Sequence, residues 1–290
     1  MKKNEILGRG TFGCVEVVLW HGVEYAAKRL RTDVRGREKK KFYEQFRTEY
    51  ELLSSLKHEN IVAYEGLCFL SHSDQADVPL LMMERLKIDL HKRLLDFTES
   101  YPGPLNLTEK FSILLGIAKG LDYLHAREPP VIHRDLTARN VLLDENNIAK
   151  IGDFGNSRIL GIDQSSCIES MTCIPGTLVY SAPEALPVTS STSYNAKIDI
   201  FSFGHLTLFV MIDEFPSVLL QSVQMNHDGT KEALSEVERR FKYMEKLKMR
   251  SVELQIPHIS TLVTDCLDNR PEKRPFAKDL ITHLETLLSS

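Results

Sequence analysis

The spacing of apolar residues changes part-way along this 290-residue chain, and the change limits the folds that it can form. Apolar side chains alternate with polar ones in residues 14–19 and again in residues 23–28, with a turn at His21-Gly22 between them. Such alternation is typical of strands with one buried face. After the Pro-Gly-Pro stretch at residues 102–104 the spacing becomes helical. Strands followed by helices predict an α+β fold, with a small β-rich N-terminal lobe and a larger helical C-terminal lobe.

We expect a single domain over residues 1–290, divided near Leu86 into an N-terminal lobe of about residues 1–85 and a C-terminal lobe of about residues 86–290. Thr108 is the expected N-cap of the first helix after the division. Residues 198–212 are almost continuously apolar, which predicts a helix buried on all sides, whereas the charged residues 231–248 predict an exposed helix. The pattern also predicts strands at residues 61–69 and 80–84 around a polar loop at 71–77, and helices at residues 39–56 and 276–288.

Composition excludes several classes of protein. A formal net charge of −4 gives no basic field for nucleic acid. No apolar run approaches the roughly 18–20 residues that span a bilayer, and the first ten residues do not resemble a signal peptide. The five cysteines are scattered and are not in metal-type pairs, so we expect reduced thiols in a cytoplasmic protein.

A glycine motif, GRGTFG, occupies residues 8–13. Alone it is a weak signal, because a dinucleotide-binding turn between a strand and a helix uses the same spacing. Here the residues after Gly13 alternate and then turn, so the glycines lie between two strands. This context favours a hairpin whose backbone N–H groups approach the phosphates of ATP. An ordinary glycine hairpin is the alternative.

Lys28 strengthens the phosphate interpretation. It lies on the return strand after Ala26-Ala27, where an inward-facing lysine is costly unless anions pair with it. Phosphates and a carboxylate on the following helix would satisfy it. We choose Glu49 as that carboxylate, with Glu44 and Glu51 as competitors.

Residues 131–155 carry the remaining chemistry. Asp135 follows His133-Arg134, and Asp153 lies thirteen residues after Asn140. Phosphoryl transfer needs a carboxylate to orient the attacking hydroxyl and accept its proton, which fits Asp135. It also needs oxygen ligands for Mg²⁺, which fits Asn140 and Asp153.

Together these motifs resemble the eukaryotic protein kinase family over residues 7–287. The resemblance implies ATP and Mg²⁺ as cofactors, with Mn²⁺ as an alternative metal, and protein substrates. It also implies an upstream activating kinase as a partner. The motifs, in chain order, are the glycine loop, Ala26-Ala27-Lys28, HRDLTARN at residues 133–140, Asp153-Phe154-Gly155, Ala182-Pro183-Glu184, DIFSFG at residues 199–204 and Arg274-Pro275.

The resemblance also assigns roles to individual residues. Met83 would lie at the back of the adenine pocket, and residues 84–86 would present backbone groups to the adenine edge. The residues implied around the nucleotide are Gly8, Arg9, Gly10, Gly13, Val15, Ala26, Lys28, Met83, Glu84, Leu86 and Leu142. The catalytic residues implied are Asp135, Lys28, Glu49 and Arg139, and the metal ligands implied are Asn140 and Asp153.

Features outside the nucleotide site follow from the same resemblance. Glu184 and Arg274 would form a buried ion pair that anchors the substrate-docking segment, and Asp199 would bond to backbone near Arg134. Arg134 would also pair with a phosphate on the activation segment. The candidate acceptors of that phosphate are Ser165, Ser166, Ser170 and Thr172.

The acceptor hydroxyl is indicated by two conflicting signals. Thr137 stands where serine/threonine kinases carry a lysine, and Arg139 stands where tyrosine kinases carry an arginine. The docking segment at residues 176–184, with Thr177, instead resembles serine/threonine kinases, and it lacks the tryptophan of tyrosine kinases. This combination is most similar to the tyrosine-kinase-like group, which is mainly serine/threonine-specific. We expect serine/threonine specificity, with tyrosine or dual specificity as the alternative.

Two other functions are weaker alternatives. A pseudokinase that only binds ATP would be expected to have lost Lys28, Asp135, Asn140 or Asp153, and all four are present. A small-molecule kinase would generally lack the long segment between Asp153-Phe154-Gly155 and Ala182-Pro183-Glu184.

Overall fold

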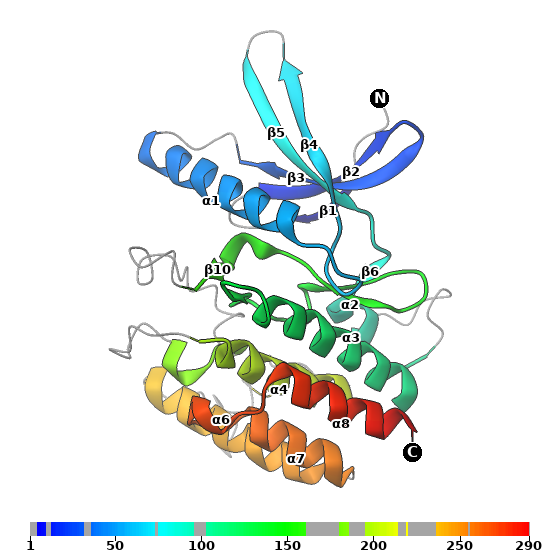
Figure 1. The fold of residues 1–290 in the computed structure, drawn as a ribbon, viewed down its shortest axis with the longest axis vertical. Helices are drawn as coiled ribbons and strands as arrows, with labels where there is room; N and C mark the ends of the chain where they lie inside the picture. Colours follow the sequence, from blue (N-terminus) through cyan, green and yellow to red (C-terminus); the bar gives the residue numbers. More distant parts are fainter. Residues whose placement is uncertain are drawn as a thin grey trace, which may run out of the picture.

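The structure is a computed structural model with a β-rich lobe above a helical lobe (Figure 1). This arrangement confirms the expected α+β, two-lobed fold. The residues that the structure describes are 5–9, 13–31, 36–72, 75–95, 103–160, 180–185, 195–213, 219, 236–254 and 256–289.

The first lobe is an antiparallel sheet of five strands in the order β1-β2-β3-β5-β4. The strands are β1 (Ile6–Arg9), β2 (Gly13–Trp20), β3 (Val23–Leu30), β4 (Tyr64–His72) and β5 (Gln75–Glu84). Helix α1 (Gly36–Ser55) lies beside this sheet (Figure 1). The helix buries Phe42, Phe46 and Leu53 in the main core.

The β4–β5 hairpin corrects one prediction. Residues 71–77 were expected to form a polar loop, but β4 continues to His72 and β5 begins at Gln75. His72 and Gln75 are register partners across the hairpin. Backbone hydrogen bonds hold an antiparallel ladder whatever the polarity of the side chains, so a polar stretch indicates exposure and not the end of a strand.

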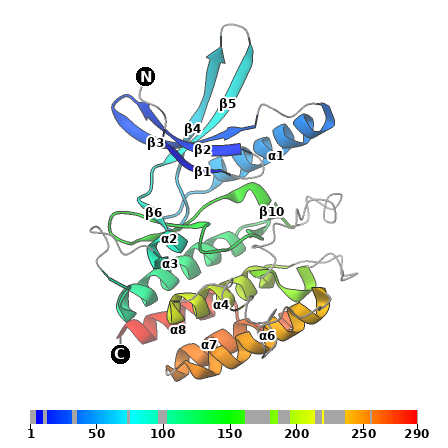
Figure 2. The ribbon, with the colours of Figure 1, turned by 180° about the vertical axis from the view of Figure 1, so that it is seen from behind.

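The second lobe contains the long helices and three short β-pairings. Its helices are α2 (Leu90–Leu95), α3 (Leu107–His125), α4 (Lys197–Ile212), α6 (Glu236–Glu253), α7 (Pro257–Cys266) and α8 (Ala277–Ser289). Its strands are β6 (Ile88–Asp89), β7 (Val131–Ile132), β8 (Val141–Leu143), β9 (Ala149–Ile151) and β10 (Arg158–Ile159), and its 3₁₀ turns are η1 (Phe154–Asn156), η3 (Pro183–Ala185) and η4 (Pro271–Lys273). Figure 2 shows α6 and α7 at the end of the molecule farthest from the five-stranded sheet.

The N-cap of helix α3 lies two residues earlier than predicted, at Asn106 and not at Thr108. The Asn106 side chain accepts a hydrogen bond from the Glu109 N–H at 2.9 Å, and the Glu109 carboxylate accepts one from the Asn106 N–H at 2.8 Å. These reciprocal bonds form a capping box. An asparagine followed three residues later by a glutamate was the sequence signal for it.

The two helices predicted from polarity alone differ in outcome. Helix α4 is buried almost throughout, as its continuous apolar run predicts. The charged segment forms α6, whose described part begins at Glu236, but the helix is not simply exposed. It buries Tyr243, Met244 and Leu247, so it is amphipathic and packs one face on the core.

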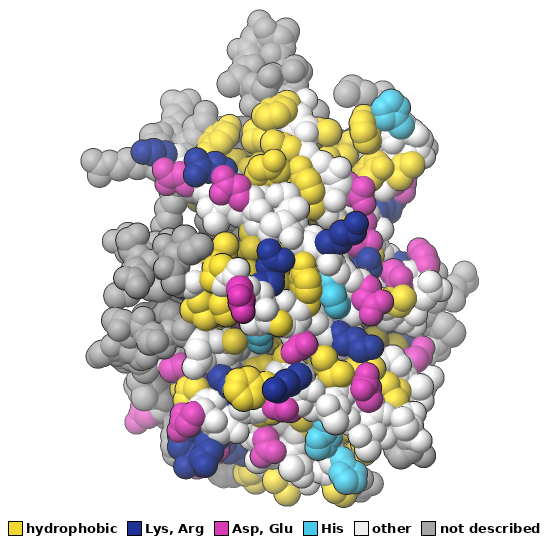
Figure 3. All heavy atoms as spheres, in the orientation of Figure 1, with side chains coloured by type: hydrophobic (Ala, Val, Ile, Leu, Met, Phe, Trp, Pro, Cys, Tyr) yellow, Lys and Arg dark blue, Asp and Glu magenta, His cyan; other side chains and the backbone are white. Residues whose placement is uncertain are grey.

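The surface carries charges of both signs. Figure 3 shows lysine, arginine, aspartate and glutamate side chains interspersed over the helical lobe on the face that it presents. Within the described ranges, no helix is both long enough and apolar enough to cross a bilayer.

The turn after α1 fixes the first lobe on the second. The Asn60 side chain donates to the Ala149 carbonyl at 2.9 Å, and the Asn60 carbonyl accepts from the Ile151 N–H at 2.9 Å. The turn also lies directly against α3, since a Cβ added at Gly120 would meet the Asn60 carbonyl oxygen at 2.9 Å. Helix α1 therefore continues into a turn that is bonded to β9, the strand just before Asp153.

Candidate active site

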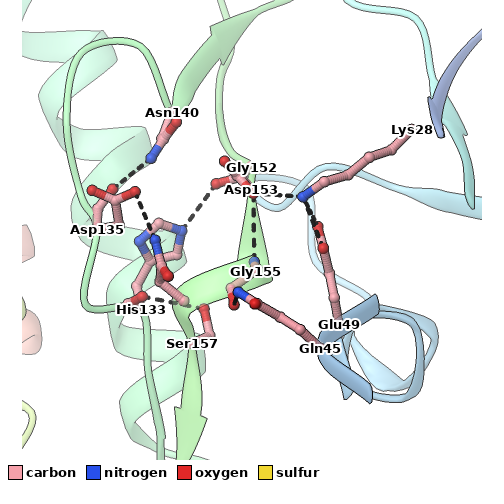
Figure 4. Close-up of polar contacts among 11 residues, drawn as sticks. Lys28, Gln45, Glu49, His133, Asp135, Asn140, Gly152, Asp153, Gly155 and Ser157 are labelled. Carbon is pink, nitrogen blue, oxygen red and sulfur yellow. Dashed lines mark hydrogen bonds and ion pairs between the residues drawn. The ribbon is translucent and has the colours of Figure 1, made fainter. Parts of the chain in front are cut away.

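Lys28 is the centre of a buried charge cluster between the two lobes (Figure 4). Its ammonium group donates to both carboxylate oxygens of Glu49, at 2.6 and 2.8 Å, and to Asp153 Oδ1 at 2.9 Å. The pairing with Glu49 is the one chosen from the sequence. The competitors Glu44 and Glu51 are exposed and pair on the surface of α1 with Lys40 and Arg47.

The electrostatics of this cluster favour the charged forms of Lys28 and Asp153, whereas burial raises the pKa of Glu49. Burial alone would lower the pKa of Lys28, but Asp153 and Glu49 together outweigh burial and raise it. Lys28 in turn holds the pKa of Asp153 below its ordinary value. The Asp153 side chain is still 49% exposed, against 4% for Glu49, so the aspartate is the carboxylate of this cluster that faces the open side.

The segment that carries Asp153 is tied to both lobes. Asp153 has a left-handed backbone (φ 56°), and its side chain accepts from the Gly155 N–H at 3.4 Å, which starts η1. Phe154 is buried with its ring edge against His133, at 5.1 Å between centroids. From α1, Gln45 donates to the Gly155 carbonyl at 2.8 Å. The position of Asp153 is therefore set from both α1 and the loop before β8.

Asp135 lies on that loop, across from Lys28 and Glu49 in Figure 4. The Asn140 amide donates to the Asp135 carbonyl at 2.7 Å and folds the loop on itself. Asp135 Oδ1 is buried and makes no hydrogen bond to any residue in the described ranges. Burial is the main reason that the pKa of Asp135 is raised to about 6.

Asp199 supports the same loop from below, as expected. Its carboxylate accepts from the His133 N–H at 2.9 Å and from the Arg134 N–H at 2.8 Å, and it also contacts His125 Nε2 at 2.9 Å. Arg134 has a left-handed backbone (φ 69°), so the loop turns sharply just before Asp135. These bonds compensate for burying the charge of Asp199 in an apolar helix.

The strand register brings several of the predicted nucleotide residues together. Gly8 on β1, Val15 on β2 and Lys28 on β3 are successive register partners, which places them in one row across the sheet. Ala26 and Met83 are register partners one strand further on.

The other predicted nucleotide residues are distributed around this row. Arg9 is exposed at the end of β1, Glu84 ends β5, Leu86 follows it, and Leu142 is half-buried on β8. Gly10 lies outside the described residues.

The two described glycines of the loop differ in what they require. A Cβ added at Gly13 would lie 1.9 Å from the Arg29 carbonyl oxygen, so the closeness of β2 and β3 already demands glycine there. A Cβ added at Gly8 would meet none of the described residues within 4 Å.

Several site contacts were not predicted from the sequence. Lys150 on β9 donates to both carboxylate oxygens of Glu84 at 2.9 Å each, and Glu84 Oε1 also accepts from the Ala63 N–H at 2.7 Å. Gln45, on α1, was likewise missed. The Lys150–Glu84 and Gln45–Gly155 contacts join residues more than sixty positions apart, and a single sequence shows no signal for such pairs.

Arg139 is exposed on the loop between β7 and β8 that also carries Asp135. Its Nη2 lies 3.3 Å from His91 Nε2 on α2. Thr137, two residues before it, is buried. Thr177 and the four candidate phosphate acceptors of the activation segment (Ser165, Ser166, Ser170 and Thr172) lie outside the described residues.

The expected ion pair between Glu184 and Arg274 is present. Two guanidinium nitrogens of Arg274 donate to the two Glu184 oxygens, at 2.6 and 3.0 Å. Ser202 on α4 donates to the Tyr180 carbonyl at 2.9 Å and holds the same segment from the other side. A bidentate pair of this kind is strong and fixes orientation.

The β-rich lobe carries the Lys28–Glu49 pair, and the helical lobe beneath it carries Asp135, Asn140 and Asp153. This combination defines a kinase-type phosphotransferase fold. The family model "Protein kinase domain" matches residues 1–284. The chain belongs to the protein kinase family.

Curated relatives support this membership. The chain is 28% identical to a "Probable serine/threonine-protein kinase" of Dictyostelium discoideum, over 99% of this chain and 25% of the relative. It is 32% identical to "Wall-associated receptor kinase-like 1" of Arabidopsis thaliana, over 99% of this chain and 38% of the relative. It is 30% identical to "Seven transmembrane domain-containing tyrosine-protein kinase 1" of Dictyostelium discoideum, over 98% of this chain and 38% of the relative. The chain thus spans well under half of these relatives, and their mixed names fit the tyrosine-kinase-like resemblance.

Proposed function

We propose that the chain is an active, ATP-dependent protein kinase that transfers the γ-phosphoryl group to serine or threonine hydroxyls of protein substrates. One observation carries the activity. Lys28 bonds at once to Glu49 of the first lobe and to Asp153 of the second, at 2.6–2.9 Å. The Lys28 ammonium group thus contacts both lobes, and it holds the proposed phosphate-binding lysine next to the proposed metal ligand Asp153, the arrangement that phosphoryl transfer requires.

Asp135 acts as the base in this proposal. Its carboxylate, whose Oδ1 bonds to none of the described residues, can accept the hydrogen bond of a substrate hydroxyl and then its proton. A carboxyl with a pKa of about 6 is mostly charged at neutral pH, which suits that role.

The residues present also fit a magnesium ion. The Asn140 amide nitrogen is bonded to the Asp135 carbonyl, which leaves the amide oxygen of Asn140 as a ligand. Asp153 exposes half of its side chain and is kept charged by Lys28. A bound Mg²⁺, or Mn²⁺, would neutralise charge on the ATP phosphates, while Lys28 contacts the phosphates and Glu49 keeps Lys28 in place.

Serine/threonine specificity rests on the docking-segment sequence at residues 176–184. Arg139 favours tyrosine, but it lies against His91, and the relatives carry both kinds of name. Tyrosine or dual specificity is the alternative. A pseudokinase is a remote alternative, because the Lys28–Glu49–Asp153 contacts are in place.

The deciding experiment is phosphoamino-acid analysis of the purified chain with radiolabelled ATP and three peptides that differ only in a Ser, Thr or Tyr acceptor. Phosphoserine or phosphothreonine supports the proposal. Exclusive phosphotyrosine would show that Arg139 outweighs the docking segment. No transfer to any peptide, together with measurable Mg²⁺-dependent ATP binding, would favour the pseudokinase.

The cellular setting belongs to the same proposal. We propose a cytoplasmic location for this domain and an upstream kinase that phosphorylates one of Ser165, Ser166, Ser170 and Thr172. Mass spectrometry of the active protein, with alanine at all four positions as the comparison, tests the second point. Full activity with no phosphate found would dispose of it.

A further inference from the structure

Asp135 is held on one side only. Of its two carboxylate oxygens, Oδ2 accepts a hydrogen bond from the side-chain amide of Asn156 at 3.2 Å, whereas Oδ1 has no partner among the described residues. The Asn140 amide donates to the backbone carbonyl of Asp135 at 2.7 Å. Rotation about the last side-chain bond of an aspartate is broad, so the backbone alone does not aim the carboxylate. The hydrogen bond from Asn156 to Oδ2 therefore restricts its orientation.

Asn156 is itself firmly placed, because it is the last residue of η1 and directly follows Asp153-Phe154-Gly155. The next residue, Ser157, donates from its N–H to the Phe154 carbonyl at 3.0 Å and from its hydroxyl to the His133 carbonyl at 3.2 Å. The Gly155 carbonyl is held from α1. The amide of Asn156 therefore belongs to a segment anchored to both lobes.

We infer that Asn156 is a positioning residue for phosphoryl transfer: its amide holds Oδ2 of Asp135 and so sets the orientation of the carboxylate that receives the acceptor hydroxyl. This inference rests on the proposed function, in which Asp135 is the base. It adds a coupling within the site, because the segment that carries the metal ligand Asp153 also aims the base. Asp135 is therefore aligned only when the segment of residues 153–157 makes its contacts with α1 and with the loop at His133.

The test compares Asn156→Ala and Asn156→Asp with the wild-type chain in steady-state kinetics. The aspartate keeps the shape of asparagine but replaces the amide donor by a second carboxylate, which adds repulsion beside Oδ2 of Asp135. We expect kcat to fall roughly ten- to a hundredfold in both variants, the range for losing a hydrogen bond to a charged group. KM for ATP should change less than about twofold, because Asn156 bonds to the base and not to Lys28. Asn146→Asp, an exposed asparagine in the turn before β9, is the matched control and should keep wild-type kinetics.

A double-mutant comparison separates positioning from general loss of structure. In an Asp135→Ala background, adding Asn156→Ala should leave the residual single-turnover rate unchanged, because the carboxylate that Asn156 aims is gone. Reductions that multiply in the double variant would overturn the inference, as would an Asn156→Ala kcat within twofold of wild type. A wild-type chain without transfer, or an Asp135→Ala variant with near-wild-type kcat, would instead refute the proposed function itself. A thermal midpoint for each single variant within a few degrees of wild type shows that the fold persists.

Discussion

Replacing Glu49 with glutamine tests the charge cluster most directly. Glutamine has nearly the shape of glutamate but carries no charge, and it keeps only one oxygen to accept the two bonds that Lys28 now donates at 2.6 and 2.8 Å. Lys28 would still pair with Asp153 at 2.9 Å. Its ammonium group would then be drawn toward Asp153 and away from the position that faces the phosphates.

The expected size of the effect follows from this partial loss. Removing one partner of a fully buried ion pair costs about 3–5 kcal/mol. Here a second carboxylate remains, so the loss should be nearer that of one charge-assisted hydrogen bond, about 1.5–3 kcal/mol. Expressed in transition-state stabilisation, this is a fall in kcat/KM for ATP of roughly 10- to 150-fold.

The assay is kcat/KM for ATP at saturating peptide, with Glu51→Gln as the control. Glu51 lies on the same helix two residues away, but it pairs with Arg47 at 3.1 Å on the surface, with 58% and 76% of the two side chains exposed. Exposed pairs of this kind contribute little. Equal kinetics for the two variants would refute the reasoning, since they would show that the buried position of Glu49 has no bearing on activity.

Four further outcomes are expected. Asp135→Asn should leave ATP affinity nearly unchanged and remove most of kcat, whereas Asp153→Ala should weaken both; calorimetry and kinetics separate the two. Lys150→Met should raise KM for ATP several-fold with little change in kcat, because it frees the glutamate at the end of β5; an unchanged KM would contradict this. Gly120→Ala should destabilise the fold by about 1–3 kcal/mol in urea unfolding, because its Cβ would lie 2.9 Å from a backbone oxygen; a stability gain would contradict it. Burial raises the pKa of Asp199, but hydrogen bonds from His125 and from backbone N–H groups outweigh burial and hold that pKa below 3.8. The stability that this carboxylate contributes is therefore present above pH 3.8 and is lost as the pH falls through the pKa of the folded state. In Asp199→Asn, the thermal midpoint should fall less steeply with decreasing pH than in the wild-type chain.

Local sequence patterns predicted the elements, while contacts between distant residues decided the details. The buried charge of Asp199 was predictable, because an acidic residue in a continuous apolar run must find donors. The choice of Glu49 over Glu44 and Glu51 came from the family resemblance. Helical spacing alone does not tell which glutamate faces the sheet.

The errors have physical reasons. Asn106 and Thr108 are both good N-caps, and only the reciprocal bond from Glu109 selects the first. The many charges of α6 predicted an exposed helix, but a helix needs only one apolar stripe to pack one face on the core. Asn156 carried no signal at all, because its importance depends on the loop containing Asp135 lying beside it in space.

The turn at Asn60, bonded to β9 and pressed against α3, makes α1 a lever with its pivot at one end. Glu49 lies about 10 Å along the helix from its end at Ser55, next to that turn, and the first turn of α1 lies roughly three times as far, at 1.5 Å per residue. A swing of about 10° would carry Glu49 about 2 Å, enough to break its bonds to Lys28, while the far end moves about 5 Å. A force applied at the first turn of α1 therefore acts on the Lys28–Glu49 ion pair with roughly three times the leverage of the same force applied at Glu49. Contacts that hold the start of this helix would control the cluster without touching it.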